Sequence, residues 1–306
     1  MQVSHIAILV NPIAGKGRGL QIASDVNSAL KENGFQTELR EFGELQEAQA
    51  LEQFVAEADL IVLAGGDGSL LHLLPVLGHT QTAVYMLPTG NESLFAREFS
   101  MSSSPEKLIK AILAANVGVH NIAQVNGRLF FTMVSVGLDS EIICRIAERR
   151  TGTIRHVSYI IPTLISALKH RPAKISVGVD GVSVIEQRKG FLVVANNKQY
   201  ALGIGFAPEA TSTSKRLVVR FFPYESFCGF LLWGLKCLFR DASRWSAAEF
   251  FEGCEVDIAA DRAIPIQADG EHIGQLPARI VGGVTCIRVL QCDDYKTKKR
   301  QQLSEY

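Results

Sequence analysis

The amino-terminal part of the chain alternates between short apolar runs and longer segments in which apolar residues recur every three or four positions. Runs of this length predict buried β-strands, and the longer spacing predicts helices with one apolar face. The predicted strands cover residues 3–10, 35–42, 60–63 and 83–87, and the predicted helices cover residues 20–30, 45–58 and a segment from Ser69. Because strands and helices alternate, we expect a doubly wound, parallel α/β sheet.

After about residue 122 the pattern becomes β-rich. Asn126-Gly127 and Asp180-Gly181 lie between apolar runs, and such pairs favour two-residue turns of antiparallel hairpins. The predicted strands cover residues 129–136, 174–179, 182–186, 191–195, 217–222, 255–259 and 285–290, with helical patterns at 140–150, 156–170 and 224–239. The sequence therefore predicts an α/β domain over residues 1–122, a β-rich, sandwich-like domain over 123–291 and a polar tail over 292–306.

The charges exclude one class of function. The chain carries 31 basic and 31 acidic residues, so it has no overall field to hold a nucleic acid. Its six cysteines contain no C-x-x-C pair, which favours reduced thiols over a disulfide framework or a zinc site. With no secretory leader pattern at the N-terminus, we expect a cytoplasmic protein.

The most apolar stretch, residues 227–239, is too short to cross a bilayer, which takes roughly 20 residues. It contains Trp233 and Lys236 and is followed by Arg240. Two readings remain open: a helix that lies on a membrane surface, or a buried helix of the second domain.

The strongest local motif is Gly65-Gly66-Asp67-Gly68-Ser69, which follows a predicted buried strand and precedes a predicted helix. In an open parallel sheet this position faces the ligand crevice. Glycines let the backbone approach phosphate oxygens, and a helix N-terminus presents free N–H groups to them. The alternative is a tight turn in which Asp67 caps its own helix.

Two further polar turns follow predicted strands. Residues 11–17 read Asn-Pro-Ile-Ala-Gly-Lys-Gly, and residues 88–97 read Pro-Thr-Gly-Asn-Glu-Ser-Leu-Phe-Ala-Arg. The first of these turns matches neither a P-loop nor a dinucleotide fingerprint. Because the carboxyl ends of parallel strands meet at one edge, three such turns predict a nucleotide site there.

The ordered set resembles a known family. N-P-x-x-G at residues 11–15, G-G-D-G-[ST] at 65–69, a P-x-G turn that ends in A-R at 88–97 and D-G-E at 269–271 are similar to the diacylglycerol kinase catalytic-domain family. That family includes bacterial lipid kinases and the sphingosine and ceramide kinases, and it is more distantly related to NAD kinases. Gly137-Leu138-Asp139, Ala195-Asn196-Asn197 and residues 206–210 also fall where such kinases carry short motifs.

The resemblance implies an ATP-dependent lipid kinase that uses Mg²⁺. It assigns Asp67 to the catalytic and metal-binding network, and Asp269 and Glu271 to the acceptor hydroxyl, with Glu271 as general base. It assigns nucleotide contacts to Asn11, Pro12, Gly15, Gly65, Gly66, Gly68, Ser69, Gly90, Asn91 and Glu92. Phosphoryl transfer requires charge neutralisation on the phosphates and a carboxylate that accepts the hydroxyl proton. The alternative for Asp269-Gly270 is a plain hairpin turn.

The chain departs from the family pattern at Leu71-His72, at Ser93-Leu94 and around Ser214, where bacterial relatives carry D-G-x-L-D and hold a structural metal ion. These departures motivate a second hypothesis, a nucleotide- or lipid-binding protein that has lost catalysis. An NAD kinase is a third. The expected partners are a lipid or another hydroxyl-bearing substrate, peripheral contact with the inner membrane face, and a second copy in a homodimer.

Overall fold

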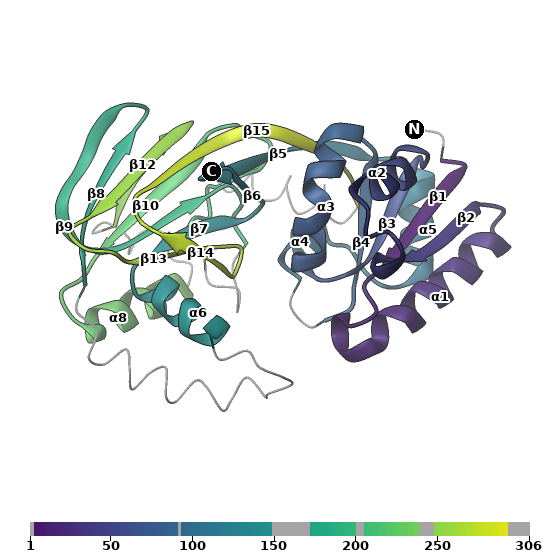
Figure 1. Ribbon diagram of the computed structural model, residues 1–306, viewed down its shortest axis with the longest axis horizontal. Helices are drawn as coiled ribbons and strands as arrows, with labels where there is room; N and C mark the ends of the chain where they lie inside the picture. The colour runs from purple at the N-terminus through teal and green to yellow at the C-terminus, as the bar shows by residue number, and fades with distance from the viewer. Residues whose placement is uncertain (1–2, 91–92, 149–171, 200–204, 239–247, 293–306) are drawn as a thin grey trace. The chain divides into compact units, whose positions relative to one another are not determined.

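The computed structural model describes residues 3–90, 93–148, 172–199, 205–238 and 248–292. The chain divides into two compact units (Figure 1). The described residues of Met1–His120 and Thr285–Tyr306 form the first, and Asn121–Val284 forms the second. The chain therefore passes between the units twice, within β5 (Val117–Val125) and within β15 (Ala278–Leu290).

The first unit is built on a parallel sheet with the strand order β15-β4-β3-β1-β2. Its strands are β1 (His5–Val10), β2 (Gln36–Glu41), β3 (Leu60–Gly65), β4 (Ala83–Pro88) and the last residues of β15. Every residue of β3 is buried, as expected of a parallel strand that is covered on both faces.

Helices connect these strands. They are α1 (Arg18–Glu32), α2 (Ala48–Ala56), α3 (Asp67–Thr80), α4 (Leu94–Glu98) and α5 (Pro105–Ala114), with short 3₁₀ turns η1 (Ala14–Gly17) and η2 (Phe42–Glu44). Helix α1 packs beside α5, and α2 packs beside α3. The doubly wound α/β architecture predicted from the sequence is confirmed.

The second unit is a sandwich of two antiparallel layers. One layer contains β8 (Lys174–Val179), β12 (Glu255–Ala260), β6 (Arg128–Phe130) and parts of β5 and β15. The other contains β7 (Met133–Val136), β10 (Leu217–Pro223), β11 (Glu249–Gly253), β13 (Pro265–Ala268) and β14 (Glu271–Gln275). Strand β9 (Val182–Ala195) belongs to both, because its first half pairs with β8 and its second half with β7 and β10.

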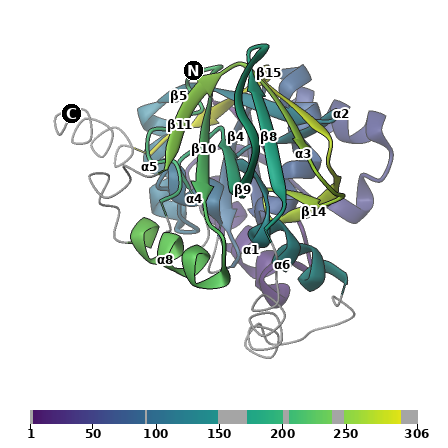
Figure 2. The same ribbon diagram turned by 90° about the vertical axis from the view of Figure 1, so that its left-hand side faces the viewer.

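Two apolar cores stabilise this unit. The first lies between the layers and includes Val177, Leu192, Val219 and Val256. The second lies on the other face of the β7 layer, where Phe191, Phe222 and Trp233 pack together. Helices α6 (Leu138–Glu148) and α8 (Phe227–Leu238) cover that face (Figure 2). The predicted β-rich second domain is confirmed.

Several expected elements have different bounds. Residues 129–136 form two strands, because the chain turns at Phe131-Thr132, while 182–186 and 191–195 belong to the single strand β9. Helix α5 and strands β5, β11, β13 and β14 were not expected. The predicted helix over 156–170 and the polar tail from residue 293 lie outside the described residues.

Candidate functional site

The first candidate site is built on the turn between β3 and α3. Strand β3 ends at Gly65, Gly66 precedes the helix, and Asp67 is its first residue. Gly66 contributes its carbonyl oxygen to the first helical turn, where it accepts from the Ser69 backbone N–H at 2.9 Å. A Cβ on Gly66 would have no atom within 4 Å, so this turn faces open space.

Asn11 joins the first polar turn to this one. Its backbone N–H donates to the Ala64 carbonyl at 3.0 Å, which continues the parallel ladder past the end of β1. Its side-chain Nδ2 donates to Ser69 Oγ at 2.9 Å, and its Oδ1 accepts from the Ile13 N–H at 3.2 Å. One amide side chain therefore holds two turns together.

Gly15 brings the first turn against the third. Gly15, Lys16 and Gly17 have φ of 60°, 62° and 84°, a run of left-handed residues that favours glycine. A Cβ on Gly15 would lie 2.2 Å from the Thr89 carbonyl oxygen. The Arg18 guanidinium donates to the Gly15 carbonyl at 3.3 Å and to the Thr89 carbonyl at 3.2 Å, which fixes this close approach.

Asp67 joins the second turn to the third. Its carboxylate accepts hydrogen bonds from Ser93 Oγ at 3.0 Å, from the Leu94 N–H at 2.7 Å and from the Phe95 N–H at 3.2 Å. It therefore caps the start of α4 and makes no cap of its own helix. Burial raises the pKa of the Asp67 carboxyl above its usual range, and the hydrogen bonds from Leu94, Phe95 and Ser93 oppose that rise.

These contacts bring the three turns together at the carboxyl ends of β1, β3 and β4, as the sequence predicted. Most of the expected nucleotide-contact residues lie in this cluster: Asn11, Pro12, Gly15, Gly65, Gly66, Gly68, Ser69 and Gly90. Asn91 and Glu92 lie outside the described residues. A Cβ on Gly90, like one on Gly66, would meet nothing within 4 Å, so both turns leave room for phosphate oxygens beside the backbone.

The cluster fits a nucleotide better than it fits a preformed metal cage. A carboxylate offers about four lone-pair sites, and hydrogen bonds occupy three of those on Asp67. Asp67 can therefore give one direct bond to a cation. Among the described residues, no group of three or more His, Cys, Asp and Glu side chains is placed to hold a metal ion. A Mg²⁺ ion here would take most of its ligands from phosphate and water, as Mg²⁺ usually does.

The second candidate site is the hairpin between β13 and β14. Asp269 and Gly270 have φ of 47° and 82°, the left-handed pair of a two-residue hairpin turn. The Asp269 carboxylate accepts from three consecutive backbone N–H groups, of Phe131 at 2.6 Å, Thr132 at 2.8 Å and Met133 at 3.0 Å. Asp269 therefore fixes the hairpin against the turn between β6 and β7.

Glu271 is the first residue of β14 and presents a partly exposed carboxylate. Its Oε2 pairs with Nη2 of Arg128 on β6 at 2.5 Å. Asp269 and Glu271 thus have different surroundings. The carboxylate of Asp269 faces backbone amides, whereas that of Glu271 faces a single guanidinium and solvent.

The residues whose side chains hydrogen-bond to this hairpin were not predicted from the sequence. Gln267 is buried, accepts from the Gly270 N–H at 2.9 Å and donates to Ser135 Oγ at 2.7 Å. Ser135 Oγ in turn donates to Asp139. Asp139 belongs to a motif noted in the sequence, but nothing in its spacing pointed to Gln267, Ser135 or Arg128.

Asn196 supports the turn between β6 and β7 from another direction. Its Nδ2 donates to the Asn121 carbonyl at 2.9 Å and to the Phe131 carbonyl at 2.8 Å. Its backbone N–H and that of Asn197 donate to the Thr132 carbonyl. The A-N-N motif therefore fixes the β6–β7 turn, and the backbone N–H groups of that turn bind the Asp269 carboxylate.

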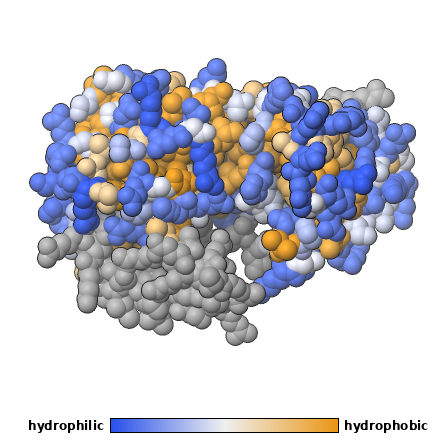
Figure 3. All heavy atoms as spheres, in the orientation of Figure 1, coloured by the Kyte–Doolittle hydropathy of each residue, from blue (hydrophilic) through white to orange (hydrophobic). Residues whose placement is uncertain are grey.

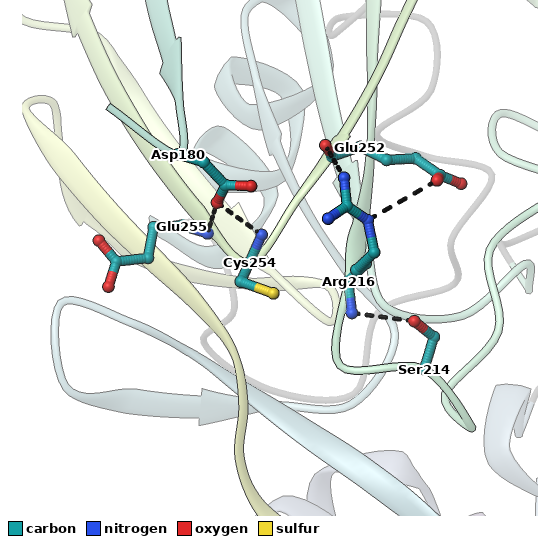
Figure 4. Close-up of polar contacts among 6 residues, drawn as sticks. All are labelled: Asp180, Ser214, Arg216, Glu252, Cys254 and Glu255. Atoms are coloured by element: carbon teal, nitrogen blue, oxygen red, sulfur yellow. Dashed lines mark hydrogen bonds and ion pairs between the residues drawn. The ribbon is translucent and has the colours of Figure 1, made fainter. Parts of the chain in front are cut away.

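The segment around Ser214 contains a positively charged side chain, that of Arg216 (Figure 4). Arg216 donates from its guanidinium to the Glu252 carbonyl at 2.6 Å, and its backbone N–H donates to Ser214 Oγ at 3.0 Å. Nearby, Asp180 Oδ1 accepts from the N–H groups of Cys254 at 2.8 Å and Glu255 at 2.9 Å. These backbone hydrogen bonds, with the Arg216 charge, lower the pKa of Asp180 below its usual range.

A hollow of about 490 Å³ lies on the outer face of β8, β12 and β15, and its lining includes Ser176, Asp257 and Arg279. Figure 3 shows hydrophobic and hydrophilic residues intermixed on the face of the molecule that it presents. Asn126 of the first predicted hairpin turn also lines this hollow, whereas none of the residues to which the motifs assign a catalytic or nucleotide-binding role does.

Comparison with known proteins identifies the family. The model of the diacylglycerol kinase catalytic domain matches residues 5–125, and that of the YegS C-terminal NAD kinase β-sandwich-like domain matches residues 132–291. The chain therefore belongs to the family in which these two domains follow one another, and the resemblance to diacylglycerol kinases that the sequence motifs indicated is confirmed.

Individual relatives agree in length and fold. A diacylglycerol kinase from Mycobacterium tuberculosis is 24% identical over 310 residues, which cover 95% of this chain and 96% of the relative. A solved diacylglycerol kinase structure from Bacillus anthracis aligns with a TM-score of 0.69 at 16% identity, over 96% of this chain and 99% of the other. An NAD kinase from Archaeoglobus fulgidus, solved in complex with ATP, aligns with a TM-score of 0.57 at 16% identity, over 99% of each chain.

No helix within the described ranges is both long and apolar enough to cross a bilayer.

Proposed function

We propose that the chain is an ATP-dependent lipid kinase, which transfers the γ-phosphoryl group of ATP to the hydroxyl of a diacylglycerol- or sphingoid-like lipid. The observation that carries this proposal is the junction at Asp67, where one carboxylate ties two glycine turns together. Such a junction presents backbone N–H groups and a helix N-terminus to phosphate oxygens. Mg²⁺ bound with ATP would neutralise the charge of the phosphates.

In this proposal Asp67 holds the second and third turns together, and it would be the residue that holds a metal ion bound with ATP. Glu271 accepts the proton of the lipid hydroxyl, because it is the carboxylate of the D-G-E motif that faces solvent. Arg128 holds the Glu271 carboxylate by a charged hydrogen bond. Asp269 positions the hairpin and takes no proton, because backbone amides surround its oxygens.

The departure at Leu94 leaves the contact at that position intact. Asp67 is bound by the backbone N–H of Leu94, which every residue except proline supplies. The family resemblance and this contact favour an active kinase over a protein that only binds its ligands.

The test is transfer of labelled phosphate from Mg²⁺-ATP to a panel of diacylglycerols, sphingoid bases and related lipids in mixed micelles. Glu271→Gln keeps the size of the side chain and removes the base, so kcat should fall by about 10²–10⁴-fold with little change in the KM for ATP. Glu255→Gln is the matched control, because Glu255 also pairs with an arginine, Arg279, at 2.5 Å in the same unit.

Equal turnover by Glu271→Gln and wild type would reject the role of Glu271. Tight calorimetric binding of ATP and lipid without turnover on any lipid would instead support the non-catalytic alternative. Formation of NADP from NAD and ATP would identify an NAD kinase.

A further inference from the structure

A buried network of hydrogen bonds, which we call the Gln267 network, links the Glu271 hairpin to helix α6. The Gln267 Oε1 accepts from the Gly270 backbone N–H at 2.9 Å. Its Nε2 donates to Ser135 Oγ at 2.7 Å and to Asp139 Oδ2 at 3.4 Å, and Ser135 Oγ also donates to Asp139 Oδ2. Gln267 and Ser135 are each 1% exposed, so water does not compete for their hydrogen bonds.

Strand register and helix packing bring the three side chains together. Gln267 on β13 lies directly opposite Ser135 on β7 in the antiparallel pairing. The residues on either side of Gln267 point into the core between the layers, so strand alternation turns Gln267 towards α6. Asp139 lies in the first turn of α6. Ser140, the next residue, donates from Oγ to the Pro265 carbonyl at 2.7 Å, which ties the start of α6 to β13.

The direction of each hydrogen bond in the network is fixed at its two ends. The Gly270 N–H can only donate, and an ionised carboxylate such as that of Asp139 can only accept. The amide of Gln267 offers an acceptor to the first and a donor to the second from one rigid planar group. A buried polar network whose members are all satisfied specifies a single geometry, so the network holds the hairpin at a defined position on α6.

The hairpin turn is held at two points. The Asp269 carboxylate binds three backbone amides of the β6–β7 turn, and the Gly270 N–H binds Gln267 on the α6 side. Two anchors prevent the backbone just before Glu271 from pivoting about either one. We propose that Gln267 is a positioning residue for phosphoryl transfer, which holds the Glu271 carboxylate at the reacting hydroxyl. This proposal rests on the proposed function, in which Glu271 accepts the proton of the lipid hydroxyl.

The test reverses the hydrogen bonds of the network. Gln267→Glu puts a second carboxylate against Asp139, and their repulsion should displace the hairpin. A displacement of about 1 Å should lower kcat about 10²-fold with the KM for ATP unchanged. Asp139→Asn alone should have little effect, because its amide oxygen can replace the carboxylate oxygen. In the double variant residue 139 donates where it accepted and residue 267 accepts where it donated, so kcat should recover about tenfold or more.

A matched control and a second measurement separate positioning from folding and from chemistry. Asp180→Asn should leave kcat unchanged, because Asp180 also accepts from two backbone N–H groups but belongs to the other Asp-Gly hairpin. Amide hydrogen exchange of Gly270, followed by NMR, reports the network without turnover. Exchange should be about tenfold faster in Gln267→Glu than in the wild type, as expected for loss of one buried hydrogen bond, and slow again in the double variant.

Three results would overturn the proposal and leave the proposed function standing. The first is wild-type kcat in Gln267→Glu. The second is a double variant as slow as Gln267→Glu, because the loss would then reflect folding. The third is an Asp139→Asn variant without turnover, because Asp139 would then act on the substrate directly. If the wild type transfers no phosphate to any lipid while Gly270 exchange follows the expected pattern, the proposed function fails, and the network has a structural role only.

Discussion

At the scale of single residues, the cluster of three turns at the ends of β1, β3 and β4 depends on close contacts that do not tolerate a larger side chain. A Cβ on Gly15 would clash with the Thr89 carbonyl oxygen, 2.2 Å away, whereas a Cβ on Gly17 would have no atom within 4 Å. Both glycines are left-handed. Both positions therefore need a residue that tolerates a positive φ, but only Gly15 also lacks space for a side chain.

We expect Gly15→Ala to lower the free energy of unfolding by about 2–5 kcal/mol, because left-handed strain and overpacking add together. Gly17→Ala should cost about 1–2 kcal/mol, since only the strain applies. Urea unfolding of the two variants measures the difference. The KM for ATP should rise more for Gly15→Ala, and equal effects of the two substitutions would show that the junction with Thr89 is not needed.

At the scale of residues, the sequence predicted the positions of the glycine turns, because glycine in a turn is recognised from its immediate neighbours in the sequence. The glycine turns could be placed because they follow buried strands. The partners of Asp67 could not, because Ser93 and Leu94 are distant in sequence and two of its three contacts are with backbone amides, which carry no side-chain signal. For the same reason the motifs did not point to Gln267, whose Oε1 accepts a hydrogen bond from the Gly270 backbone N–H.

At the scale of elements, two Asp-Gly hairpins invite comparison. Asp180 and Asp269 have φ of 48° and 47°, and each accepts hydrogen bonds from backbone N–H groups of a neighbouring segment. The sequence identified the Asp180 turn because apolar strands flank it. It did not identify β13 or β14, because their four and five residues are short and β14 reads Glu-His-Ile-Gly-Gln, without alternation.

We expect Asp269→Ala to lower kcat by about 10²-fold, because a shift of about 1 Å in a reacting group has an effect of that size and the hairpin would lose its three hydrogen bonds to the β6–β7 turn. Asp180→Ala removes the corresponding carboxylate of the other hairpin and should leave kcat unchanged. Steady-state phosphotransfer by both variants is the measurement. If both fell equally, the effect would reflect folding of the sandwich and not the position of Glu271.

At the scale of the whole molecule, the first unit is discontinuous in sequence. The last residues of β15 add a parallel strand beside β4. Gln81 Nε2 donates to the Cys286 carbonyl at 3.0 Å, and the Gln291 side chain contacts the buried His120 at 2.8 Å. Alternation of strands and helices predicted the sheet, but nothing local in residues 285–290 showed that they pair in parallel with a strand about 200 positions earlier.

A fragment of residues 1–120 should therefore unfold at a lower temperature than the same fragment joined by a flexible Gly/Ser linker to residues 285–292, because only the second can complete the sheet and pair His120. Circular dichroism melting of both fragments tests this expectation. Identical melting curves would mean that β15 contributes nothing to the first unit.

Strand β9 makes the two cores of the sandwich interdependent. Up to Gly190 it runs in one layer and after it in the other, and beyond that point Leu192 and Val194 point between the layers while Phe191 and Val193 point towards α6 and α8. Side chains alternate strictly along a strand, so adding or deleting one residue near Gly190 would exchange the two sets at once. Insertions and deletions in β9 should therefore be tolerated only when they comprise two residues. No single contact in the molecule imposes this constraint.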